Sequence, residues 1–121
     1  MRIGFDAKRA FSNFTGLGNY SRDTIRILEK FYPKNQYYLF TPNSKLNKRL
    51  DFINKKENIH TISPNNFFDK TFKSLWRSKN IVRDIIRHKI DIFHGLSHEL
   101  PVGIEKTNIK TVVTIHDLIY L

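Results

Sequence analysis

Short apolar runs alternate along this chain with longer segments in which apolar residues recur at helical spacing. The apolar runs predict five β-strands, at residues 3–6, 36–41, 59–63, 91–94 and 110–115. Residues 18–31 and 65–89 predict amphipathic helices, whereas residues 43–58 are polar and basic and predict a loop or a short helix. Strands that alternate with helices in this way predict an α/β fold, with a Rossmann-like parallel sheet that has helices on both faces.

The spacing of the apolar residues also predicts one apolar side for each helix. In the first helix the residues at helical spacing are Tyr20, Thr24, Ile27, Leu28 and Phe31. In the second helix the apolar side is marked by Phe72, Leu75, Trp76, Val82, Ile85 and Ile86, and the basic side by Lys73, Arg77, Lys79, Arg83 and Arg87. The β-branched strand at residues 110–115 is typical of a central strand in a parallel sheet.

Three polar segments follow the carboxyl ends of predicted strands. They are the glycine turn at residues 15–20, the loop after His94, and the pair formed by His116 and Asp117. Ligands of parallel α/β sheets bind beyond these strand ends. The sequence therefore predicts that the functional site is built from these three segments.

The glycine turn holds a G-x-G pair, Gly16 and Gly18, between the first strand and the first helix. Ser21 stands where a dinucleotide site has its third glycine, and no acidic residue follows about twenty positions later. No lysine follows the turn as a P-loop requires, so the turn predicts neither an NAD site nor a Walker A loop. A tight turn with positive φ is one interpretation. The position before a helix favours another, an anion site in which backbone N–H groups and the helix dipole attract negative charge.

The loop after the fourth strand contains two histidines four positions apart, His94 and His98, followed by Glu99. Histidines at this spacing share one face of a helix and resemble a metal pair, which Glu99 can join. Gly95 and Pro101 favour a loop over a helix, so a zinc site is the weaker interpretation. We expect a polar loop that binds substrate, and a loop whose polar residues are only solvated is the alternative.

His116 and Asp117 come directly after the fifth strand. At the carboxyl end of a strand an imidazole can donate a hydrogen bond to a sugar hydroxyl or a phosphate. Asp117 can accept from a hydroxyl group or orient a neighbouring side chain. The alternative is a histidine that is satisfied by local backbone.

Composition limits the classes of partner and site. The chain has 121 residues, a net charge of +10 and no cysteine, which excludes disulfides and thiolate metal sites and fits a reducing cytoplasm. It contains neither an apolar run of transmembrane length nor a signal-peptide h-region at its start. The positive charge indicates a polyanionic partner, such as nucleic acid, an anionic membrane or a phosphorylated substrate, and a generally basic surface is the alternative.

The second predicted helix concentrates this charge. Between residues 70 and 89 it holds seven Lys or Arg residues and one acidic residue. Such a helix can lie on an anionic membrane, here through Arg77, Arg83 and Arg87, although a core helix with one solvated face is the favoured interpretation. Most aromatic residues fall on predicted apolar faces, which argues against base stacking and against nucleic acid as the partner.

Three stretches taken together resemble one known family. FDAKRAF…TGLGNYSR, DIFHGLSHELP and TIHDL occur in the order found in the N-terminal domain of GT-B glycosyltransferases, and together they span the whole chain. They look most like family four, whose retaining enzymes include many mannosyl- and glucosyltransferases of cell-surface glycan assembly. The resemblance implies a nucleotide-sugar donor, a glycan or lipid-linked acceptor, and no requirement for a metal or another cofactor. We expect a cytoplasmic protein, with peripheral contact to the inner face of the membrane as an open alternative.

The resemblance also implies a role for each residue of the predicted site. The residues that would approach the donor phosphates are Gly16, Leu17, Gly18 and Asn19. His116 is the expected catalytic residue and would contact the donor sugar near the reacting carbon. The residues expected on the acceptor side are His94, Gly95, Ser97, His98, Glu99 and Asp117. The family suggests a same-face mechanism, in which the leaving diphosphate helps to deprotonate the acceptor.

Members of this family have a second Rossmann-like domain that grips the donor and carries paired acidic residues. Nothing after Leu121 supplies that domain, so we expect residues 1–121 to form a single acceptor-side domain of a longer enzyme. Such a domain would fold but would not transfer sugar alone, and its fifth strand would lie near an exposed sheet edge. The alternative function is a non-enzymatic basic module that binds anions or a membrane surface.

Overall fold

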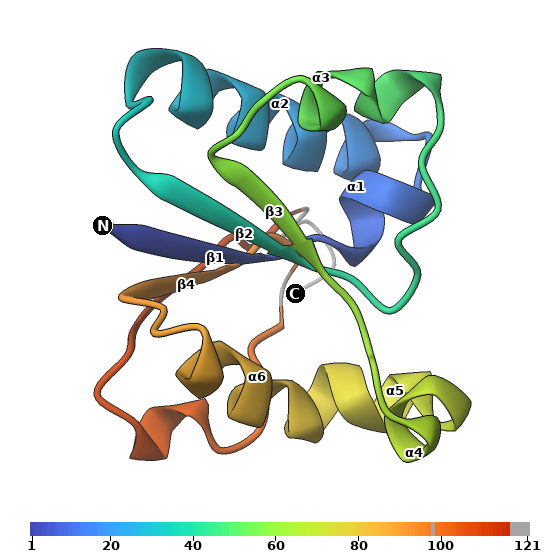
Figure 1. The fold of residues 1–121 in the computed structure, drawn as a ribbon, viewed down its shortest axis with the longest axis vertical. Helices are drawn as coiled ribbons and strands as arrows, with labels where there is room; N and C mark the ends of the chain where they lie inside the picture. The colour runs from blue at the N-terminus through green and yellow to red at the C-terminus, as the bar shows by residue number, and fades with distance from the viewer. Residues whose placement is uncertain (98, 117–121) are drawn as a thin grey trace.

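Five β-strands form a single parallel sheet in the computed structural model, which describes residues 1–97 and 99–116. The strands are β1 (Arg2–Asp6), β2 (Gln36–Phe40), β3 (Ile59–Ile62), β4 (Ile92–Gly95) and β5 (Lys110–Val113). Their order in the sheet is β3-β2-β1-β4-β5, which makes β1 the central strand (Figure 1). The five predicted strands are confirmed.

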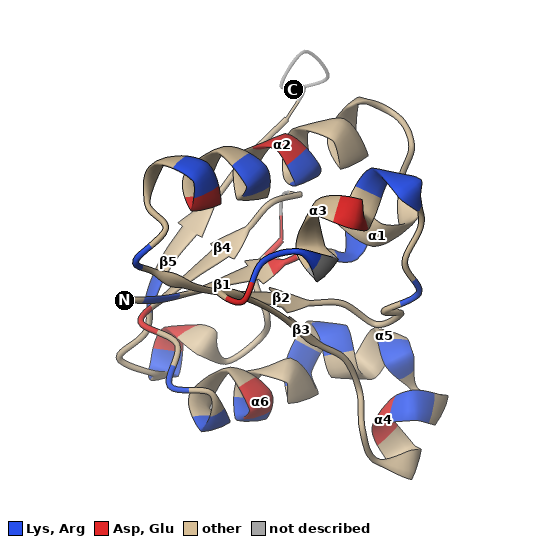
Figure 2. Cartoon of the chain, turned by 45° about the horizontal axis from the view of Figure 1, so that its top comes forward, with Lys and Arg blue, Asp and Glu red and all other residues tan. Residues whose placement is uncertain are grey.

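Helices cover both faces of the sheet, which confirms the predicted Rossmann-like α/β fold (Figure 1). One layer consists of α1 (Lys8–Ser12), α2 (Gly16–Phe31), the 3-10 turn η1 (Lys48–Leu50) and α3 (Asp51–Asn54). The other consists of α4 (Phe67–Thr71), α5 (Lys73–Leu75), the π-helical segment η2 (Trp76–Asn80), α6 (Ile81–Arg87) and the 3-10 turn η3 (Ile104–Lys106). Lys and Arg residues lie along the helices of both layers (Figure 2).

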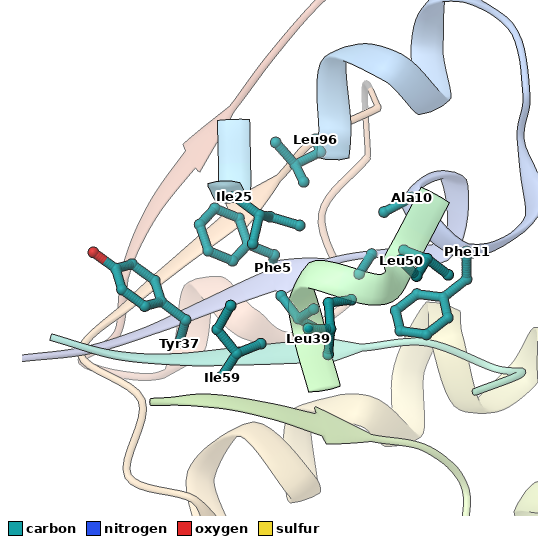
Figure 3. Close-up of a cluster of buried hydrophobic side chains, with 11 residues drawn as sticks. Phe5, Ala10, Phe11, Ile25, Tyr37, Leu39, Leu50, Ile59 and Leu96 are labelled. Atoms are coloured by element: carbon teal, nitrogen blue, oxygen red, sulfur yellow. The ribbon is translucent and has the colours of Figure 1, made fainter. Parts of the chain in front are cut away.

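Strand side chains alternate between two apolar clusters, one on each face of the sheet. The buried members of the first cluster, shown in Figure 3, are Phe5, Ala7, Ala10, Phe11, Ile25, Tyr37, Leu39, Leu50, Ile53, Ile59 and Leu96. The buried members of the second cluster are Tyr38, Phe40, Trp76, Ile81, Ile85, Ile90, Phe93 and Ile104. Successive residues of β2 enter the two clusters in turn, so a slip of one residue would exchange their environments.

The second predicted helix is interrupted, so the prediction of one continuous helix was wrong. The backbone leaves the helical conformation at Phe72, where φ is −110° and ψ is 64°, and this break separates α4 from α5. The buried carboxylate of Asp69 fixes the position of α4 before the break. It accepts hydrogen bonds from Asn66, Asn80 and Arg83, and thereby ties α4 to η2 and α6. Local periodicity does not reveal such contacts, because none of the three donors lies within α4, and Asn80 and Arg83 come from η2 and α6.

Several side chains on the predicted apolar sides are exposed, which corrects the sequence interpretation. They are Tyr20, Ile27 and Phe31 on α2, and Phe72, Leu75 and Ile86 in the other layer. On α2 the buried side contains Ile25 and Arg22 instead, because the Arg22 guanidinium donates to backbone carbonyls before the helix. Trp76 and Ile85 are buried as predicted.

The strand predicted to be central, β5, lies at the edge of the sheet, so that prediction was wrong. Among the strands of the described ranges only β4 pairs with it, and all four residues of β5 are exposed. The expectation that this strand lies near an exposed edge is confirmed.

Candidate functional site

The site is centred where the carboxyl ends of β1 and β4 lie side by side. Asp6 of β1 and Gly95 of β4 are register partners. β2 and β3 lie on one side of β1, and β4 and β5 lie on the other. The direction in which successive strands are added to the sheet therefore reverses between β1 and β4, which is the topological switch point of the sheet. Open α/β sheets bind their ligands in the crevice at such points.

Asn13 organises the turn before α2 through its side-chain oxygen. Asn13 Oδ1 accepts from the Thr15 N–H at 2.8 Å, from the Thr15 hydroxyl at 2.7 Å and from the Gly18 N–H at 3.1 Å. The Asn19 N–H donates to the Thr15 carbonyl at 3.0 Å. Two of the four amides predicted to approach a phosphate are therefore bonded within the protein. A phosphate here would bind the other two amides or displace Asn13.

Neither glycine of the G-x-G pair has a positive φ, so the tight-turn interpretation was wrong. Gly16 and Gly18 both lie in the first turn of α2. Gly18 is required for space, since a Cβ there would lie 1.8 Å from the Asn13 carbonyl oxygen. At Gly16 a Cβ would meet no atom within 4 Å. Close packing therefore restricts one glycine of the pair and leaves the other unrestricted.

Arg22 is a buried cation behind the glycine turn that the sequence pattern did not single out. Its Nη1 donates to the carbonyls of Ala10 and Asn13, at 2.9 and 2.7 Å, and its Nη2 donates to Asn19 Oδ1 at 2.6 Å. Burial, with a smaller effect of Arg49, lowers the pKa of this guanidinium from its ordinary value. The Asn19 side chain thus holds Arg22 and positions the turn. Asn19 and Arg22 are three positions apart on one helix, and this spacing is the sequence signal that could have predicted their contact.

His116 contacts both Tyr20, near the start of α2, and the loop after β4. The Tyr20 ring meets the imidazole at 4.8 Å between centroids, with the ring planes at 83°. His116 Nε2 lies 2.8 Å from the Leu96 carbonyl oxygen, which can only accept, so this nitrogen carries the proton. Leu96 is 20 positions earlier in the chain, so this backbone partner is not local. The three predicted segments therefore meet at His116.

His94 belongs to a chain of polar contacts at the same edge of the sheet. Its Nε2 lies 2.6 Å from Thr114 Oγ1, and that hydroxyl lies 3.4 Å from the Tyr20 hydroxyl. The imidazole also packs against the Phe5 ring, at 5.7 Å between centroids. Burial lowers the pKa of His94 below its ordinary value of 6.5, which favours the neutral ring.

We expect the protein to lose stability as the pH falls below about 6.5. The pKa of His94 is lowered in the folded chain, so the unfolded chain binds more protons in this range and protonation favours unfolding. Burial also lowers the pKa of His88, which adds to the same trend. Urea unfolding between about pH 7.5 and about pH 5 should show a steeper loss for the wild-type chain than for His94→Gln. Equal slopes for the two chains would contradict this account.

Glu99 lies on the η2 side of the sheet. Its carboxylate pairs with Arg77 at 2.9 Å, and Arg77 also makes a two-point contact with Asp6, at 2.6 and 3.2 Å. These three side chains line a cavity of about 370 Å³ together with Phe93 of the second apolar cluster. The predicted acceptor side is therefore divided, with His94 against the first cluster and Glu99 against the second.

The rest of the predicted acceptor loop folds back on the end of β4. A Cβ at Gly95 would lie 2.0 Å from the Glu99 carbonyl oxygen, and Ser97 is buried. His98 and Asp117 lie outside the described residues, so the zinc interpretation, which requires His98, stays a prediction. In residues 1–97 and 99–116 no group of three or more His, Asp or Glu side chains is arranged to hold a metal ion.

Three residues join this edge of the sheet that lie outside the predicted site segments. They are Asp6, Arg77 and Thr114. Tyr20 belongs to the predicted glycine turn, but no role at the site was predicted for it. Asp6 offered a signal, because a polar residue at the last position of a buried strand lies at the carboxyl edge. Arg77 offered none, since its segment read as the solvated side of a long helix.

No protein-family model, curated protein or solved structure matches the chain. The fold and the site define a class, namely an α/β protein with a Rossmann-like sheet and a polar cluster at its switch point. Of the helices in the described ranges, none is both long enough and apolar enough to traverse a bilayer.

Proposed function

We propose that residues 1–121 form the acceptor-side domain of a retaining glycosyltransferase of the GT-B type, similar to family four. The enzyme would move a sugar from a nucleotide-sugar to a glycan or a lipid-linked acceptor in the cytoplasm, without a metal. A second domain, outside these residues, would hold the nucleotide.

The contact between Tyr20 and His116 is the observation that supports this proposal. It places Tyr20, which directly follows the first turn of α2, against an imidazole at the carboxyl edge of the sheet. That first turn is the positive end of a 16-residue helix. Departure of a nucleotide diphosphate builds negative charge on phosphate oxygens. Backbone N–H groups at a helix start stabilise such charge, and one preorganised donor is typically worth about 3 kcal/mol. His116 would contact the sugar that carries this leaving group, near the reacting carbon.

The cavity beside Arg77 supports an acceptor on the other side of β1. Asp6 and Glu99 present carboxylate oxygens there, and carboxylates accept hydrogen bonds from sugar hydroxyls. Arg77 contacts both carboxylates and holds them in place.

An NMR titration of the ¹⁵N-labelled chain with UDP-glucose and GDP-mannose tests the proposal. We expect amide shifts at Gly16, Leu17 and His116, and their loss in His116→Ala. His60→Ala is the matched control, because that imidazole lies on β3 and contacts Gln36 at 2.8 Å. The control should shift as the wild-type chain does.

Two results would contradict the proposal. One is the absence of shifts at these amides, and the other is an equal response to inorganic phosphate spread over the lysines and arginines, which would indicate a general anion-binding module. We also expect no sugar transfer by residues 1–121 alone. Product formed by this chain without a second domain would contradict its assignment as an acceptor-side domain.

A further inference from the structure

We propose that α4 and α5 form a docking surface for an anionic lipid bilayer. The inference is independent of the proposed function and would stand if that function were wrong. It concerns the part of the second helical layer that directly follows β3 (Figure 1).

Three phenylalanines expose their rings on and after α4. Phe67, Phe68 and Phe72 have 85%, 50% and 53% of their surface exposed. The ring centroids of Phe68 and Phe72 lie 4.9 Å apart, so these two rings are packed together, and Phe67 is the residue directly before Phe68. Grouped exposed rings of this kind mark an interaction surface.

The fold of α4 explains why these rings are not buried. Asp69 is anchored on its inner side by Asn66, Asn80 and Arg83, which turns the opposite side of α4 outward. The backbone break at Phe72 then prevents one continuous buried face from forming. The exposure is therefore a consequence of specific buried hydrogen bonds.

Lysines accompany the phenylalanine patch. Lys70 lies on α4 and Lys73 begins α5, and basic residues are visible on both helices in Figure 2. Both lysines line a polar hollow of about 300 Å³ with the hydroxyls of Ser44 and Ser63. Lys73 also lines a second hollow of about 170 Å³ with Lys8. Ammonium and hydroxyl groups are donors that suit lipid phosphates.

Lys70 and Lys73, together with Lys8 of α1, differ from the arginines of the layer that contains α4 and α5. Arg77, Arg83 and Arg87 each pair with a carboxylate, whereas none of the ion pairs within the described ranges involves Lys8, Lys70 or Lys73. The charge available to a bilayer therefore comes from the lysines of this surface. The contact suggested by the sequence, through the three arginines, is the weaker one.

A bilayer fits both parts of the surface better than a second copy of the chain does. Aromatic rings enter the boundary between headgroups and acyl chains, while lysine ammonium groups stay at the phosphates. A symmetric dimer would bring Lys70 and Lys73 against their own copies, in a chain whose net charge is already +10. Charge complementarity thus favours an anionic surface.

Co-sedimentation with vesicles tests this proposal. We expect the chain to bind vesicles of about 30% phosphatidylserine in phosphatidylcholine, and to bind pure phosphatidylcholine at least about tenfold more weakly. The pair Lys70→Gln and Lys73→Gln should lower binding to the anionic vesicles by about tenfold or more. The pair Phe67→Ser and Phe72→Ser should lower it by a similar factor. All four side chains are exposed, so the melting temperature should change little.

The other helical layer provides a matched control. Phe31 on α2 is 66% exposed, and the Lys30 ammonium lies 5.6 Å from the centre of its ring. The pair Lys30→Gln and Phe31→Ser should leave vesicle binding unchanged. An equal loss for this pair, or no binding to anionic vesicles at all, would overturn the proposal. So would an oligomer that dissociates in the Phe67→Ser variant without vesicle binding, because it would assign the surface to a second copy.

Discussion

Replacing Trp76 with alanine is expected to lower the free energy of unfolding by about 3–5 kcal/mol. Trp76 is fully buried and belongs to the second apolar cluster with Phe40, Phe93 and Ile85. Alanine would leave a cavity between the sheet and η2 that the surrounding side chains fill only in part. Domains of this size are commonly stable by about 5–15 kcal/mol, so the variant would lose a large share of its stability.

The indole of Trp76 also has a polar partner. Its Nε1 donates to Asp84 Oδ2 at 2.7 Å, and Asp84 is buried. Trp76→Phe would keep much of the apolar contact but remove this donor, at a cost of about 1–3 kcal/mol. The ion pair of Asp84 with Arg87, at 2.9 Å, limits that loss. Comparing the alanine and phenylalanine variants therefore separates the energetic cost of the cavity from the cost of the lost hydrogen bond.

Urea unfolding followed by circular dichroism measures both Trp76 variants. Phe67→Ala is the matched control, since it removes another aromatic ring of the same layer that is 85% exposed. The control should stay within about 0.5 kcal/mol of the wild-type chain. Equal losses for Trp76→Ala and Phe67→Ala would show that η2 does not pack against the sheet as described.

Gly18→Ala is expected to destabilise the chain by about 1–3 kcal/mol or more, and Gly16→Ala by much less. The added methyl at position 18 would meet the Asn13 carbonyl oxygen at 1.8 Å, which forces the turn away from α2. At position 16 it would meet no atom within 4 Å. Both variants remove a similar amount of freedom from the unfolded chain, so the difference between them isolates the clash.

Thermal unfolding compares the two glycine variants, and NMR reports where the structure changes. In Gly18→Ala we expect altered amide shifts at Thr15 and Asn19, because Asn13 would no longer hold the turn. The same amides should keep their positions in Gly16→Ala. A larger loss of stability for Gly16→Ala than for Gly18→Ala would contradict the packing argument.

The strands could be predicted from the sequence because their signal is local. Residues 36–41 and β2 (Gln36–Phe40) nearly coincide, since β-branched and aromatic side chains suit a pleated surface wherever the strand lies. Helix faces were less predictable. The buried Arg22 on α2 depends on carbonyl groups that reach it from before the helix, and no periodicity within the helix encodes them.

The location of the candidate site could be predicted from local signals, but the pairing of its side chains could not. Its location followed from residue types at strand ends, which brought the glycine turn, His94 and His116 to one edge. The pairing of Glu99 with Arg77 could not be predicted, because the two residues are 22 positions apart and are brought together only by the fold. The role of each residue in sugar transfer stays a prediction.

By itself, the sequence determined the class of fold, the five strands and the edge at which polar residues gather. The strands and the fold class follow from the spacing of apolar residues along the chain. The edge follows from the carboxyl ends of parallel strands, which all lie on the same side of a sheet. Only the tertiary structure decided the order of the strands, the interruption after α4 and the exposure of Phe67. Each of these depends on contacts between residues that are distant in the sequence, such as the hydrogen bond from Asn80 to Asp69. The local spacing of residues does not reveal such contacts.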